Sequence, residues 1–289
     1  MRSKLFVPGS RQELFAKALA GDADAISFDL EDSVTDDRKA QARADVAAFV
    51  ETSAARDAAK LIIVRINALG SPEFEADVFA LAKPGVTLIN LPKPESADDV
   101  REAIAAIERA ESAQGLAEPI RLLVNIETPK ALRAAAEIAR AHPRVAGLQL
   151  GLGDLFEPLG FDRRDTASVH AAMFAVRMAA GEAGIFACDG AFADIANEAG
   201  FRAEAEMARR LGFVGKSCIH PRQVAWANEI FRASDTEIAL ARRVVEAARQ
   251  ASSQGRAAFV VDGRMIDLPY LKRAEAIVAA ADAASDADR

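Results

Sequence analysis

The chain has 289 residues, of which 51% are hydrophobic and 27% charged, the balance of a folded protein with a sizeable core. Its formal net charge of −7 argues against nucleic acid as a main partner. Residues 1–21 have no continuous apolar stretch long enough for a secretion signal, and no run approaches the ~18 apolar residues of a membrane span, so we expect a cytoplasmic protein. Cys188 and Cys218 lack zinc-binding spacing and are expected to be free, buried thiols.

Short apolar segments of strand length recur along the chain. The predicted strands are Lys4–Val7, Ala25–Asp29, Leu61–Ile66, Val86–Leu91, Ile120–Ile126, Val145–Leu150, Ile185–Cys188 and Phe213–Ile219. Most are uninterrupted rather than alternating, which is typical of parallel strands buried on both faces. The predicted helices between them are Arg38–Glu51, Ala97–Ala113, Pro129–Ala141, Thr166–Ala183 and Ala203–Leu211. This alternation favours a (β/α)₈ TIM barrel, with a doubly wound open sheet as the alternative.

The residues after the eighth strand exceed what a barrel needs. We therefore predict a barrel domain over 1–232 and a C-terminal helical extension over 233–289 that contacts its own barrel or an adjacent subunit. The extension's predicted helix, small polar hinge, strand and final helix are Asp235–Gln250, Ala251–Gly255, Ala257–Val261 and Pro269–Ala284.

Charged side chains follow most of the predicted strands, at the end where barrel enzymes place their active sites. The interior of the barrel is expected to be apolar. Strand ends that are simply solvated are the alternative explanation for these charges. The polar residues in question are Asp29, Glu31, Asp32, Arg65, Asn67, Lys93, Asn125, Glu127, Asp154, Asp189, Lys216, Ser217 and His220.

Glu127 and Asp154 follow successive strands, so their carboxylates are expected to meet above the barrel. Hard oxygen ligands completed by water suit Mg²⁺ better than zinc. The alternative is that Glu127 contacts a helix N-terminus while Asp154 caps the turn before Leu155. Arg65 emerges from an apolar strand and suits a carboxylate or a developing oxyanion, unless it forms a structural ion pair with Glu31 or Asp32.

A series of motifs in order along nearly the whole chain resembles the citrate lyase β-subunit and malyl-CoA lyase family, within the HpcH/HpaI aldolase and citrate lyase superfamily. The motifs are Arg2-Ser3-Lys4-Leu5-Phe6-Val7-Pro8-Gly9, Asp29-Leu30-Glu31-Asp32-Ser33-Val34, Val64-Arg65-Ile66-Asn67, Leu91-Pro92-Lys93, Ile126-Glu127-Thr128-Pro129, Gly153-Asp154-Leu155, Gly212-Phe213-Val214-Gly215-Lys216, Ile219-His220-Pro221-Arg222-Gln223 and Val261-Asp262-Gly263-Arg264-Met265-Ile266-Asp267. Each motif is modest, but together they are specific.

The resemblance implies a (β/α)₈ barrel and a role for each matching residue. Glu127 and Asp154 would bind Mg²⁺, Arg65 would be the active-site arginine, and Glu31 and Asp32 would hold metal-bound waters and orient it. The residues implied for coenzyme A binding are Arg2, Lys4, Phe6, Pro8 and Lys93, and less firmly Lys216 and Ile219.

The resemblance further implies that Asp267 enters the active site of an adjacent subunit and acts there as the general base or acid. We therefore expect a homo-oligomer, a trimer or a hexamer, with composite sites. The alternative is that Asp267 only caps the final helix.

The implied activity is a Mg²⁺-dependent carbon–carbon lyase that cleaves or forms a 3-hydroxyacyl-CoA, such as malyl-, citramalyl- or citryl-CoA, with acetyl-CoA and a 2-oxoacid as the other partners. The alternatives are an acyl-CoA thioesterase on the same site, a citrate lyase complex subunit acting on an acyl-carrier-protein thioester, and a non-catalytic metabolite-binding barrel. The identity of the acyl group is not readable, because one methylene in a pocket is worth only ~1–3 kcal/mol.

Overall fold

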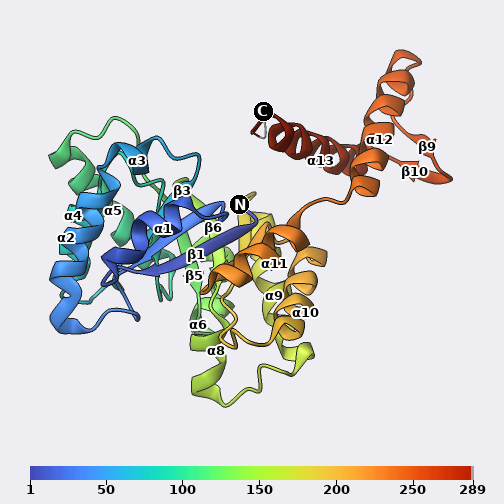
Figure 1. The fold of residues 1–289 in the computed structure, drawn as a ribbon. Helices are drawn as coiled ribbons and strands as arrows, with labels where there is room; N and C mark the ends of the chain where they lie inside the picture. Colours follow the sequence, from blue (N-terminus) through green and yellow to red (C-terminus); the bar gives the residue numbers. More distant parts are fainter. Residues whose placement is uncertain (288–289) are drawn as a thin grey trace. The chain divides into compact units, whose positions relative to one another are not determined.

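The computed structural model describes residues 1–287, and the chain divides into two compact units (Figure 1). The first unit is Met1–Phe231, and the second begins at Arg232. Within the described part of the chain, no helix has the length and apolar character needed to cross a membrane. Cys188 and Cys218 are free and buried, as the sequence predicts.

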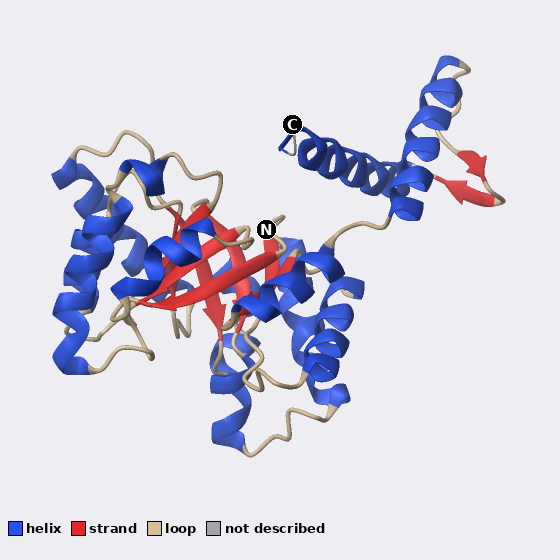
Figure 2. Cartoon of the chain, viewed as in Figure 1, coloured by secondary structure: helices blue, strands red, loops and turns tan. Residues whose placement is uncertain are grey.

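The first unit is a closed barrel of parallel strands whose spatial order is the order of the chain (Figure 2). Closure confirms the predicted TIM barrel and excludes the doubly wound sheet, whose edges would stay open. The strands are β1 (Ser3–Pro8), β2 (Ala25–Asp29), β3 (Leu61–Arg65), β4 (Leu88–Leu91), β5 (Arg121–Ile126), β6 (Val145–Leu150), β7 (Phe186–Asp189) and β8 (Gly215–Cys218).

Helices cover the outside of the barrel, and the main apolar core lies between them and the strands. They are η1 (Gln12–Leu14), α1 (Phe15–Ala20), η2 (Asp36–Arg38), α2 (Lys39–Val50), α3 (Ser53–Arg56), α4 (Phe74–Leu81), α5 (Ala97–Gln114), α6 (Pro129–Arg133), α7 (Ala135–Ala139), α8 (Leu152–Phe156), η3 (Glu157–Leu159), α9 (Thr166–Glu182), α10 (Glu198–Arg210) and α11 (Pro221–Phe231).

Two of these helices differ from the sequence prediction. The segment predicted as one helix over Pro129–Ala141 is divided into α6 and α7, because the backbone at Ala134 has a ψ of 8° and leaves the helical range. Helix α10 begins at Glu198 rather than Ala203, because the Asn197 side chain accepts a hydrogen bond from the Gly200 N–H and caps the earlier turn.

The interior of the barrel is layered, and the expectation that it is apolar throughout is wrong. The layer nearer the amino ends of the strands is apolar and contains Ala25, Ile63, Leu88, Leu123 and Ala146. Side chains alternate along each strand, so every second residue points inward. The next inward positions on β1, β4 and β5 are Lys4, Asn90 and Asn125, which are buried polar residues.

The second unit has its own small core, formed by Ala241, Val244, Val261, Ile266 and Ala274. Its elements are α12 (Asp235–Ser253), the hairpin strands β9 (Phe259–Val261) and β10 (Arg264–Ile266), and α13 (Leu268–Ala287). The sequence missed β10. Of the hinge predicted over Ala251–Gly255 within the extension, the first three residues belong to α12 and the other two lead toward the hairpin.

Candidate active site

Arg65 is the centre of a buried ion-pair network where β2 and β3 end. Asp29 and Arg65 are paired in register on the neighbouring strands. The guanidinium Nε and Nη2 each lie 2.7 Å from an Asp29 carboxylate oxygen, a bidentate pair, and Nη1 lies 2.9 Å from Glu31 Oε2 and 3.3 Å from Asp32 Oδ2. Burial alone would lower the pKa of Arg65, but the hydrogen bonds and charge of Asp29 raise it, so the guanidinium is permanently charged.

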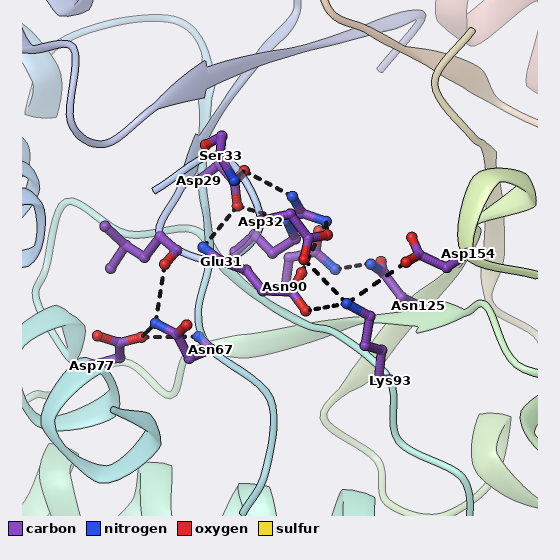
Figure 3. Close-up of polar contacts among 12 residues, drawn as sticks. Asp29, Glu31, Asp32, Ser33, Asn67, Asp77, Asn90, Lys93, Asn125 and Asp154 are labelled. Atoms are coloured by element: carbon purple, nitrogen blue, oxygen red, sulfur yellow. Dashed lines mark hydrogen bonds and ion pairs between the residues drawn. The ribbon is translucent and has the colours of Figure 1, made fainter. Parts of the chain in front are cut away.

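A second network holds the loop that carries Glu31. The buried Lys39 ammonium donates to the Leu30 and Glu31 carbonyl oxygens, each 3.0 Å away, and to Asn67 Oδ1 at 2.7 Å. Asn67 Nδ2 in turn donates to the Leu30 carbonyl and to Asp77 of α4 (Figure 3). These hydrogen bonds fix the loop and thereby hold Glu31 next to Nη1 of Arg65.

Lys93, just after β4, brings the acidic residues together. Its Nζ lies 2.8 Å from Glu31 Oε1, 3.2 Å from Asp32 Oδ1 and 3.7 Å from Asp154 Oδ1 (Figure 3). Its φ of 52° lies in the left-handed region, a conformation that costs a non-glycine residue about 1–3 kcal/mol. This strained backbone lets the Lys93 N–H donate to Glu127 Oε1 at 2.8 Å while the side chain reaches the carboxylates.

Glu127 is almost completely buried at the end of β5, with 2% of its surface exposed. Its second oxygen accepts a hydrogen bond of 3.1 Å from Asn125 Nδ2. A Cβ at Gly151 would lie 2.5 Å from that same oxygen, so only glycine leaves room for the carboxyl group here. Burial, followed by the nearby charges of Glu31 and Asp154, raises the pKa of Glu127 to about 7.

Asp154 lies in the first turn of α8, immediately after β6, and its side chain is 43% exposed. It approaches Lys93 from the side of the barrel opposite Asp29 and Glu31 (Figure 3). We call the following seven residues the rim cluster: Asp29, Glu31, Asp32, Arg65, Lys93, Glu127 and Asp154. With every carboxyl ionised, the five carboxylates of the rim cluster exceed its two cations by three charges.

Five predicted site residues, Arg65, Glu31, Asp32, Glu127 and Asp154, therefore lie in one cluster, and Lys93 joins them as their cation rather than at a separate position. Three more predicted residues lie near this end of the barrel. The guanidinium of Arg65 lies 5.1 Å from the centre of the Phe6 ring. Pro8 is in register with Asp29, and Ile219 follows β8 with 37% of its surface exposed.

The structure does not bring three of the predicted coenzyme A residues to the rim. Arg2 precedes β1 at the opposite end of the strands and pairs with Asp24 at 2.7 Å. Lys4 is fully buried inside the barrel. Lys216 is also fully buried, with Nζ 2.6 Å from both Asp189 and Glu204 of α10 on the outer side of the barrel. None of these cations is placed to meet a phosphate at the rim, and the prediction for them is not supported.

Asp267 belongs to the second unit, directly before α13. Its backbone carbonyl accepts from the Leu271 N–H, whereas its buried Oδ1 has no hydrogen-bond partner in the described part of the chain. Capping of α13 therefore does not account for this oxygen.

The sequence missed the roles of Asp29, Asn90 and Asn125. The available signal was the polar residue inside an otherwise apolar strand, as in Leu88–Leu91, where a buried amide needs a partner. The described residues contain no group of three or more histidine, cysteine or acidic side chains arranged to bind a metal by themselves. Any metal ion at Glu127 and Asp154 would therefore need water or substrate oxygens, as the sequence analysis expected.

A family model described as HpcH/HpaI aldolase/citrate lyase matches residues 2–221, which covers the whole barrel up to the start of α11. The chain belongs to this family. The match spans every residue of the rim cluster, so the cluster lies within the part of the chain that defines the HpcH/HpaI aldolase/citrate lyase family.

Relatives in this family are similar over nearly their full lengths. An L-malyl-CoA/β-methylmalyl-CoA lyase of Cereibacter sphaeroides is 36% identical over 97% of this chain and 94% of its own. A citrate lyase subunit β of Escherichia coli is 38% identical over 97% and 93%. The crystal structure of the protein CitE from Mycobacterium tuberculosis, in complex with magnesium, acetoacetate and coenzyme A, is 33% identical, covers 96% of this chain and 98% of its own, and has a TM-score of 0.75.

Proposed function

We propose that the protein is a Mg²⁺-dependent carbon–carbon lyase that cleaves or forms a 3-hydroxyacyl-CoA, with a 2-oxoacid and acetyl-CoA as the other partners. Carbon–carbon lyases of this kind are its relatives at 36–38% identity over nearly the whole chain. The observation that carries the proposal is the rim cluster itself, in which five carboxyl groups share two cations around the buried Glu127.

The residues present fit a divalent cation. Glu127 and Asp154 offer hard oxygen atoms, and the pKa of Glu127 is raised by burial and by its acidic neighbours. A divalent cation would offset that repulsion and favour the ionised carboxylate. Glu127 and Asp154 would hold the ion, and Mg²⁺ would supply Lewis-acid stabilisation of negative charge on the oxoacid half of the substrate.

The remaining rim residues would position and stabilise the reacting centre. Arg65 would donate to oxygens that gain charge as the carbon–carbon bond breaks. Its bidentate pair with Asp29 holds the guanidinium plane before substrate arrives, so little orientation is lost on binding. Glu31 would keep Arg65 and Lys93 apart at fixed positions, since its two oxygens contact one cation each.

Asp267 is proposed as the proton-transfer residue, supplied by an adjacent subunit of a homo-oligomer. Support comes from its Oδ1, which has no hydrogen-bond partner in the described chain, so no contact within the chain accounts for this carboxyl group. A trimer, or a hexamer built from trimers, would close such composite sites. We propose that this assembly works in the cytoplasm, and that Phe6, Pro8 and Ile219 contribute to the coenzyme A site.

The test is a panel assay of purified protein with malyl-, citramalyl-, β-methylmalyl- and citryl-CoA, with Mg²⁺ and after its removal. We expect cleavage of at least one thioester to a 2-oxoacid and a shorter acyl-CoA, which is acetyl-CoA except for β-methylmalyl-CoA, whose methyl group makes it propionyl-CoA. The cleavage should stop when Mg²⁺ is chelated. Glu127→Ala and Asp154→Ala should each abolish turnover, whereas Arg101→Ala on the surface of α5 should not. Absence of oxoacid from every substrate, or release of free CoA alone, would contradict the lyase and in the second case identify a thioesterase.

A second candidate is favoured by the 38% identity to the citrate lyase subunit β of E. coli. In that case the same site would act on a thioester carried by an acyl carrier protein. Co-purification of a stable complex with an acyl carrier protein, together with turnover of the carrier thioester but not the CoA thioester, would support it.

A further inference from the structure

A line of hydrogen bonds crosses the barrel interior from Lys4 to Glu127. Lys4 Nζ donates to Asn90 Oδ1 at 3.4 Å, and Asn90 Nδ2 donates to Asn125 Oδ1 at 2.7 Å. Asn125 Nδ2 then donates to Glu127 Oε2 at 3.1 Å. Figure 3 shows Asn90 and Asn125 beside the rim cluster. We call Lys4, Asn90 and Asn125 the interior chain.

The ends of the interior chain fix the direction of every bond between them. An ammonium group can only donate, and an ionised carboxylate can only accept. When Lys4 and Glu127 are both charged, Asn90 must therefore turn its oxygen to Lys4, and Asn125 must turn its amide nitrogen to Glu127. The second hydrogen of the Asn90 amide donates to the Leu123 carbonyl at 3.0 Å, which supports the same orientation.

Burial of the Lys4 ammonium at this position lowers the stability of the fold. Lys4 is fully buried, its Nζ lies 3.9 Å from the centre of the Phe6 ring, and Asn90 is its hydrogen-bond acceptor within the described chain. Burial lowers the pKa of Lys4 to about 7, the expected result for an ammonium held without a close carboxylate. A methionine would fill the same space at lower cost to the fold, so stability does not explain a lysine here.

We propose that Lys4, Asn90 and Asn125 are positioning residues, which act through their chain of hydrogen bonds to aim the Glu127 carboxylate at the bound metal ion. The proposal rests on the proposed function, because it needs Glu127 to be a metal ligand. Partners behind a metal ligand orient it and raise its affinity for the ion, typically by about 10–100-fold. The alternative is that Lys4 acts only through its charge, and the two make opposite predictions: loss of a nearby positive charge would by itself tighten binding of a divalent cation.

The experiment is a double-mutant cycle on the full chain with Lys4→Met, Asn90→Leu and both together. Affinity for Mn²⁺ is measured by electron paramagnetic resonance and for Mg²⁺ by calorimetry, neither of which needs turnover. We expect Asn90→Leu to weaken binding about tenfold or more and Lys4→Met to weaken it less, and the double variant to be no weaker than Asn90→Leu alone. Ser27→Ala is the matched control, an interior polar residue outside the chain, and should leave metal affinity unchanged.

Each outcome has one meaning. Tighter metal binding by Lys4→Met, or additive effects in the cycle, would overturn the interior chain while leaving the metal site intact. Lack of metal binding by the unaltered protein would overturn the proposed function and this proposal together. Thermal melting identifies any variant that does not fold, and Asn90→Ser closes the same cycle if Asn90→Leu fails. For folded variants with an active parent, kcat is expected to fall more than KM changes, since the ion rather than coenzyme A is misplaced.

Discussion

One cluster of charged residues lies where barrel strands end, a second lies between β7, β8 and α10, and their balance of charge is different. The rim cluster has five carboxylates and two cations. The second cluster, which we call the outer cluster, consists of Arg163, Asp189, Glu204 and Lys216 and has two of each. A buried cluster that is neutral is complete by itself, whereas one with excess negative charge needs a further cation. The difference distinguishes a structural network from a site.

The two clusters also differ in the direction in which their side chains point. Lys216 donates both to Asp189 and to Glu204 of α10. Glu204 in turn accepts hydrogen bonds from Arg163, which extends the network away from the barrel. Burial alone would lower the pKa of Lys216, but Asp189 and Glu204 raise it, so the ammonium stays charged. The rim residues instead point toward the barrel axis and its open end. The alternation of side chains along a strand therefore separates the inward-facing rim cluster, for which we propose a function, from the outward-facing outer cluster.

Breaking the outer cluster gives the largest expected effect on stability. Lys216→Met leaves Asp189 buried without its cation and should lower the free energy of unfolding by about 3–5 kcal/mol. Metal affinity should stay unchanged, because the cluster lies outside the barrel. Urea denaturation monitored by circular dichroism measures the first quantity and calorimetry the second.

The control for this prediction is an exposed ion pair. Arg202→Ala removes the surface pairs with Glu198 and Glu229 and should cost only about 0–1 kcal/mol. A change in metal affinity with Lys216→Met, or a loss of stability no greater than that of Arg202→Ala, would contradict the separation of the two clusters.

The sequence predicted the barrel because eight apolar segments of strand length alternate with helical segments. It pointed to Glu127, Asp154 and Arg65 because these polar residues follow or end apolar strands, and the motifs that resemble a known family then assigned their roles. The sequence could not predict which strand residues point into the barrel and which point toward the surrounding helices. Lys4 and Lys216 look alike in the sequence, as single lysines within short strands, yet one points into the barrel and the other to α10. A shift of one residue in strand register exchanges these environments, and register depends on contacts between distant segments.

The next prediction uses pH to titrate the excess charge of the rim cluster. The pKa of Glu127 is raised to about 7, so its carboxyl group binds a proton that competes with a metal ion. Affinity for Mg²⁺ should fall about tenfold for each pH unit below about 7 and level off above it. Calorimetry between pH 5.5 and 8.5 tests this, and affinity that is flat across that range would contradict it.

Without metal, the same shift predicts the sign of a stability change. The folded protein holds the Glu127 proton more strongly than the unfolded chain, in which the pKa of this glutamate has its ordinary value of 4.5. The free energy of unfolding should therefore decrease as pH rises from 4.5 toward 7, in the presence of a chelator. In Glu127→Gln this part of the pH dependence should be absent.

The smallest expected effect tests whether every polar residue of the barrel interior serves the site. Ser27 is fully buried on β2, and its Oγ has no hydrogen-bond partner in the described chain, unlike Asn90 and Asn125. A buried hydroxyl without a partner destabilises the fold, so Ser27→Ala should raise the free energy of unfolding by about 1 kcal/mol. Denaturation with urea measures the change. A loss of stability instead would mean that Ser27 Oγ is hydrogen-bonded in solution, and the interior would then contain a second polar network beside the interior chain.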